Sequence, residues 1–164
     1  MDREDAIDVL LRQWQQSPYE LPLAAMAVAK RITRVARNLE QRYAEALAEF
    51  GLDPGEFDVL ATLLRSGPPH ELAPATLNRS LLISSGGLTK RLTRLEKRGF
   101  VSRRLDPDDR RSLLAALTDQ GLAVTAKAVI VHAQAGTGLV DPFSEADQAQ
   151  LVSFLRKLLL HQES

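Results

Sequence analysis

The alternation of apolar and polar positions along the chain predicts a mainly α fold. Four apolar side chains near the start recur at the i, i+3, i+4, i+7 spacing of one helix face: Ile7, Leu10, Leu11 and Trp14. They predict a short helix over residues 2–16, which Ser17-Pro18 and Leu21-Pro22 interrupt. A long helix is expected over residues 23–50, before Gly51.

Capping signals mark where later helices begin. Asp53 is expected as an N-cap, because Pro54 follows at the first helical position and Glu56 stands three residues further on. Similar signals predict four more helices, over residues 74–81, from Ser84 or Ser85 to Gly99, from Thr118 to about residue 135, and from Ser144 to about residue 161. Residues 101–105 and 112–117 are expected as strands around a turn. Two short helices followed by a hairpin are typical of a winged helix-turn-helix.

The helix that starts near Ser85 has the composition of a DNA-reading helix. Leu88, Leu92 and Leu95 fall on one side and predict a buried face. The remaining surface carries hydroxyls and long cations, which contact bases and phosphates in the major groove. We predict DNA contacts from seven side chains: Ser84, Ser85, Thr89, Lys90, Thr93, Arg94 and Lys97. The alternative is a solvated basic face that binds nothing.

The turn between the two strands mixes arginines and aspartates. Arg110 and Arg111 stand at its end, where an arginine can enter the negative minor groove of duplex DNA. Asp109 is placed to hold such an arginine in position. The alternative is a surface turn whose ion pairs contribute under about 1 kcal/mol.

Local charge supports DNA binding although the formal net charge is zero. Residues 79–111 contain ten basic and four acidic side chains, so this segment carries +6 and the rest of the chain −6. Phosphates respond to the local field of the segment that contacts them.

Other classes of protein find little support in the sequence. There is no cysteine, which excludes disulfides and thiolate metal sites. The three histidines lack metal-ligand spacing, and no catalytic triad or phosphate-binding loop stands out, so we expect no metal, no cofactor and no enzyme. No apolar run is long enough to span a membrane and no signal peptide is visible, which makes a cytoplasmic protein the expectation.

Taken together, these motifs resemble the MarR family of transcriptional regulators. The resemblance rests on the run from Gly55 to Leu60, Ser84-Ser85-Gly86, the basic helix, the turn Asp106–Arg111 and Leu117-Thr118. It implies a homodimer that binds a pseudo-palindromic operator in double-stranded DNA, usually as a repressor that a small ligand releases. It also implies dimerisation helices in residues 1–50 and 121–164 around a DNA-binding domain in residues 51–120.

Four further residues suit a planar anionic ligand: Trp14, Asp58, Arg91 and Arg103. Guanidinium groups match its charge and plane, a carboxylate accepts its N–H groups, and an indole covers a face. The set resembles that of the urate-responsive, PecS-like branch of the MarR family, so urate leads the candidates. Three alternatives stay open. In the first, the ligand is another aromatic or organic acid. In the second, the four residues are scaffold, in which Asp58 pairs with Arg91. In the third, the protein is a ligand-independent architectural DNA-binding protein.

Overall fold

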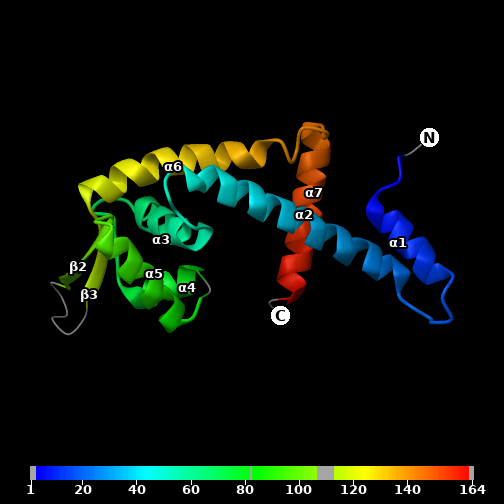
Figure 1. Ribbon diagram of the computed structural model, residues 1–164, viewed down its shortest axis with the longest axis horizontal. Helices are drawn as coiled ribbons and strands as arrows, with labels where there is room; N and C mark the ends of the chain where they lie inside the picture. Colours follow the sequence, from blue (N-terminus) through cyan, green and yellow to red (C-terminus); the bar gives the residue numbers. More distant parts are fainter. Residues whose placement is uncertain (1–2, 82, 107–112, 163–164) are drawn as a thin grey trace. The chain divides into compact units, whose positions relative to one another are not determined.

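The computed structural model describes residues 3–81, 83–106 and 113–162 (Figure 1). The chain divides into two compact units, one ending at Arg42 and the other beginning at Tyr43, and helix α2 (Leu23–Ala48) runs through the boundary. No helix in the described ranges is long and apolar enough to cross a membrane.

The first unit contains helix α1 (Ala6–Gln15) and most of α2. Asp5 caps α1 and accepts hydrogen bonds from the backbone N–H groups of Ile7 and Asp8. Ion pairs from Arg31 link α2 to the start of α1. The guanidinium of Arg31 lies 2.8 Å from the carboxylate of Asp5 and 2.5 Å from that of Asp8. The observed helix therefore begins four residues later than predicted, where its cap is satisfied.

The second unit is built from helices around a small sheet. Its remaining helices are α3 (Pro54–Arg65), α4 (Pro74–Leu81), α5 (Ser85–Lys97), α6 (Asp119–Thr137) and α7 (Glu145–Gln162). Strands β1 (Glu71–Leu72), β2 (Val101–Leu105) and β3 (Leu113–Leu117) pair antiparallel in the order β1-β3-β2. Figure 1 shows α6 running along α3, with α5 leading into the hairpin of β2 and β3. This is a mainly helical winged helix-turn-helix, as predicted.

One core joins these elements. The leucine row of α5 is buried as predicted, with Leu88, Leu92 and Leu95 exposed by 1%, 3% and 0%. The row packs with Leu60 of α3 and Leu77 of α4. Full burial of each such side chain contributes about 1.5–3 kcal/mol to the stability of the fold. The leucine row therefore holds one side of α5 against the core.

The cap predictions are confirmed. Asp53 and Glu56 form a capping box at the start of α3, Ser84 caps α5, and Thr118 caps α6. Strand β1 was not predicted, because two residues carry no readable alternation.

The joint between the hairpin and α6 leaves no room for a side chain at Gly121. A Cβ atom there would lie 1.9 Å from the carbonyl oxygen of Phe100. We expect Gly121→Ala to lower the free energy of unfolding by about 1–3 kcal/mol, because backbone must move. Gly86→Ala is the matched control, since Gly86 has open space around it. Urea denaturation of both variants measures this effect. A Gly121→Ala variant as stable as the Gly86→Ala variant would contradict the prediction.

Candidate nucleic-acid interface and ligand site

The outward face of α5 carries two exposed lysines. Lys90 and Lys97 lie opposite the buried leucine row, two helical turns apart. Among the described residues, neither ammonium group forms an ion pair. Ser84 and Ser85 at the start of the helix, and Thr89 along it, are also exposed, while Thr93 is half-buried. These groups are open to solvent and to a phosphate backbone.

Arg94 does not share this free face. Its Nε lies 2.6 Å from Oε1 of Glu56, and its Nη2 lies 2.8 Å from Oδ2 of Asp53. The side chain of Arg94 is half exposed, and its contact with DNA stays a prediction. A wheel drawn for α5 alone omits the carboxylates at the start of α3, so it does not predict this pairing.

Arg98, one turn beyond Arg94, continues this contact. Its guanidinium donates hydrogen bonds of 2.8 Å to the carbonyl oxygens of Phe50 and Gly51 and lies 3.4 Å from Glu56. It also lies over the ring of Phe100, 4.6 Å from the centroid. No role for Arg98 is predicted from the sequence. The i, i+4 spacing of the two arginines was the available signal.

The other flank of α5 contacts the hairpin. Arg103 of β2 donates a 3.0 Å hydrogen bond to the hydroxyl of Thr93 and lies 3.4 Å from Glu96. The next residue, Arg104, pairs with Glu71 of β1 through both guanidinium arms. Successive strand residues point to opposite faces, so the two arginines tie the hairpin to α5 and to β1.

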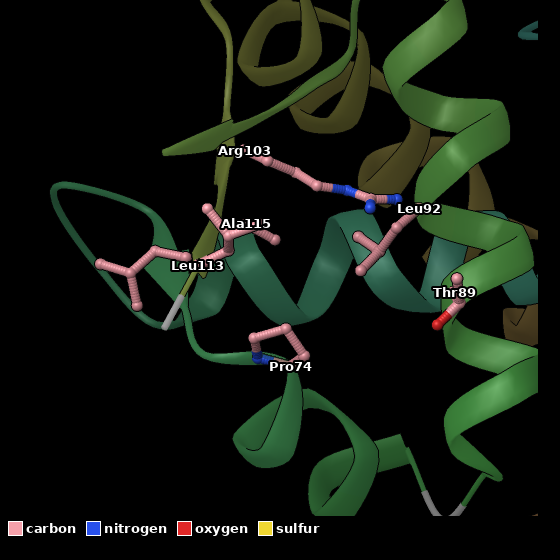
Figure 2. A pocket seen from close by; sticks show the side chains of 7 residues that line it. Pro74, Thr89, Leu92, Arg103, Leu113 and Ala115 are labelled. Carbon is pink, nitrogen blue, oxygen red and sulfur yellow. The ribbon is translucent and has the colours of Figure 1, made fainter. Parts of the chain in front are cut away.

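A small cavity of about 80 Å³ lies between α4, α5 and the hairpin. Figure 2 shows Arg103 extending across it from β2, with its guanidinium beside Leu92. Thr89 supplies a hydroxyl, and the other lining side chains are apolar: Pro74, Leu92, Leu113, Leu114 and Ala115. The cavity is smaller than the roughly 300–1,000 Å³ of most ligand pockets, and the one guanidinium at its edge is already bonded to α5.

Arg91 lies elsewhere, on the flank of α5 that faces α3, and Asp58 belongs to α3. The guanidinium of Arg91 packs against Gly55, where a Cβ atom would lie 2.5 Å from it. Asp58 lies at the surface, with its carboxyl partly buried. Within the described residues the two side chains form no ion pair, although each lies in the electrostatic field of the other. The cavity at Arg103 is lined by neither of them.

The environment of Asp58 raises the pKa of its carboxyl. Partial burial disfavours the charged form most, and the positive charges of Arg91, His132 and Arg65 oppose that effect. His132 of α6 is stacked between Tyr43 and Phe57, with ring centroids 3.9 Å and 4.4 Å away. Burial lowers the pKa of His132.

The remaining predicted residues are placed less fully. Trp14 belongs to the first unit, is 39% exposed, and meets Tyr19 edge to face with ring centroids 6.4 Å apart. Asp109, Arg110 and Arg111 lie outside the described residues. Among the residues that are described, no cluster of three metal-ligating side chains occurs.

A basic helix held against a helix-turn-helix core, with a hairpin beside it, defines a winged helix-turn-helix DNA-binding protein. The model of the MarR family matches residues 50–112. The HTH-type transcriptional regulator PecS of Dickeya dadantii (strain 3937) is 31% identical over 161 residues, covering 98% of this chain and 97% of PecS. The chain belongs to the MarR family of transcriptional regulators.

Solved structures support the same assignment. The MarR family regulator Sco3205 of Streptomyces coelicolor, in complex with DNA, is 26% identical, with a TM-score of 0.77 over 88% of this chain and 91% of its own. A mutant MarR from E. coli complexed with operator DNA is 25% identical, with a TM-score of 0.75 over 86% of this chain and 99% of its own. This chain is therefore a DNA-binding transcriptional regulator, and the prediction that it is not an enzyme is confirmed by the regulators it resembles.

The raised pKa of Asp58 makes a prediction about stability. A carboxyl whose folded-state pKa is raised costs stability when it ionises, so Asp58→Asn should raise the free energy of unfolding at pH 7. The gain should shrink as pH falls through the folded-state pKa and vanish below about pH 4, where the unfolded chain is protonated as well.

Urea denaturation between pH 3.5 and pH 7.5 measures this effect, with Asp141→Asn, at an exposed loop position, as the control. A loss of stability for Asp58→Asn at pH 7 would show instead that Asp58 holds Arg91 as a scaffold pair.

Proposed function

We propose that this regulator is a homodimer that represses transcription from a pseudo-palindromic operator and is released by a planar anionic metabolite, with urate as the leading candidate. The observation that carries the DNA-reading part is the solvent-facing row on α5, where Lys90 and Lys97 have no ion-pair partner among the described residues. In this proposal Ser84, Ser85, Thr89 and Thr93 supply the hydroxyl contacts.

The hairpin supplies the second DNA contact in this proposal. Arg110 and Arg111 would enter the minor groove, with Asp109 holding them in position. In the described part of the hairpin, strand β2 is bonded to α5 through Arg103 and to β1 through Arg104.

Apolar side chains on the terminal helices support the dimer. No residue of α7 is buried, and its exposed apolar side chains include Val152, Phe154, Leu155, Leu158 and Leu159. A stripe of this kind is costly to leave in water, and a second copy would cover it. Two copies also match the two half-sites of an operator, which lie about 34 Å apart in successive major grooves.

The ligand part of the proposal keeps Trp14, Asp58, Arg91 and Arg103 as the binding residues. It is supported by Asp58 and Arg91, which form no ion pair within the described ranges, and by Arg103, which borders a cavity. Arg91 leaves α5 on the flank that faces α3, and Arg103 reaches the opposite flank of α5 from the hairpin.

A ligand that engaged both arginines would therefore have to break the link from Arg103 to Thr93 and Glu96, which joins the hairpin to α5. A coupling of about 1–3 kcal/mol would change operator affinity about 5- to 150-fold. The competing function is a ligand-independent DNA-binding protein in which these residues only stabilise the fold.

Lys90→Ala tests the reading face. Loss of one phosphate contact should weaken binding to the operator and reduce the slope of log K against log salt by about 0.9. Binding is measured at several salt concentrations with a duplex that the wild-type protein selects from a random pool. Lys127→Ala, an exposed lysine on α6 outside the apolar stripe of α7, is the control and should bind as the wild type does. An unchanged slope for Lys90→Ala would remove Lys90 from the interface.

Urate tests the ligand. It should bind the free protein, quench the fluorescence of Trp14, the only tryptophan, and lower operator affinity. Asp58→Ala and Arg91→Ala should abolish this response while retaining most DNA binding, because neither side chain lies on the outward face of α5. Isothermal titration with urate, xanthine, hypoxanthine and salicylate separates the candidate ligands. If none gives heat or changes operator affinity, the regulator is ligand-independent towards this class.

A further inference from the structure

We propose that Glu56 is a positioning residue for DNA binding: it fixes the orientation of α5 through Arg94 and Arg98, and Arg94 acts as an anchor within the protein. The inference rests on α5 being the DNA-reading helix. It assigns Arg94, a cation on the reading helix, to contacts made inside the protein.

Glu56 is almost completely buried, with 6% of its side chain exposed. Its Oε1 receives the Nε of Arg94 at 2.6 Å, and its Oε2 lies 3.4 Å from Nη1 of Arg98. The same Oε2 accepts the backbone N–H of Asp53 at 3.3 Å, which closes the capping box of α3. A carboxylate removed from water requires such partners, so the geometry of all three is coupled through one group.

Two ion pairs restrain the orientation of α5 more than one ion pair would. Arg94 and Arg98 are four residues apart and leave the helix on the same flank. A single ion pair would let α5 pivot about the contact, whereas two that converge on one carboxylate restrain its rotation about its own axis. That rotation decides which side chains of α5 face the major groove.

The contact extends along the whole α2–α3 corner. Arg94 also binds Asp53 at 2.8 Å, and Arg98 donates to the carbonyl oxygens of Phe50 and Gly51. These carbonyls follow the C-terminal end of α2, where a cation is favourable. Movement of the corner is therefore passed to the last turns of α5.

Glu56→Gln isolates this role. Glutamine also serves at the third position of a capping box, so the start of α3 is retained while the charge that attracts both arginines is lost. We expect operator affinity to fall about 10- to 100-fold, as misplaced base contacts do, with an unchanged salt slope, because no phosphate contact is removed. The probe is the duplex that the wild-type protein selects from a random pool.

Arg94→Gln should reproduce this loss with an unchanged slope, and the double variant should bind no more weakly than the weaker single variant. If Arg94 instead contacts a phosphate, its variant lowers the slope by about 0.9, Glu56→Gln binds as the wild type does, and the two effects add. That pattern would overturn the proposal and leave DNA reading by α5 intact.

Two further variants separate orientation from stability. Val59→Ala removes buried volume from the same helix without touching either arginine, and it should bind the operator normally at temperatures where it is folded. Arg94→Lys keeps the positive charge on a side chain that is half exposed, so folding is not at risk, but it loses the two-armed contact. Weak binding by Arg94→Lys supports positioning; normal binding overturns it.

Discussion

A helix of thirteen residues is marginal in water, so α5 depends on the rest of the protein both for its existence and for its direction. Three of its sides are occupied by protein. Its leucine row enters the core, one flank meets the α2–α3 corner, and the other meets the hairpin. Within the described residues, the fourth side, which carries Lys90 and Lys97, is open to solvent. The reading face is thus defined by what surrounds the other three sides.

Arginine and lysine are divided between these sides in a way that their chemistry explains. The guanidinium groups of Arg94 and Arg98 bind carboxylate and carbonyl oxygens, which suit a planar group with several donors, and that of Arg91 packs against Gly55. The ammonium groups of Lys90 and Lys97 lie in solvent, where a flexible point charge keeps its hydration. A count of cations on the helix conceals this division.

Most of the fold could be predicted from signals that act over a few neighbouring residues. Asp53, Ser84 and Thr118 act within three residues of themselves, and the spacing of Leu88, Leu92 and Leu95 is a property of one helix, so both kinds of feature were predictable. The site was less predictable because its contacts join distant segments. Arg94 meets a carboxylate thirty-eight residues away, and nothing near Arg94 in the sequence announces that partner. The exposure of Asp58 likewise depends on which helices pack beside it.

Gly55 shows how such a distant contact can still leave a trace in sequence. Its missing side chain provides the space that the guanidinium of Arg91 occupies. The two positions therefore form a linked pair, in which a larger residue at 55 and an arginine held in this place at 91 are mutually exclusive. A Cβ atom at position 55 would displace the guanidinium, which is the flexible end of the arginine, and leave the backbone of α3 where it is. The glycine thus acts on the electrostatics of α5, because it decides where one positive charge lies beside that helix.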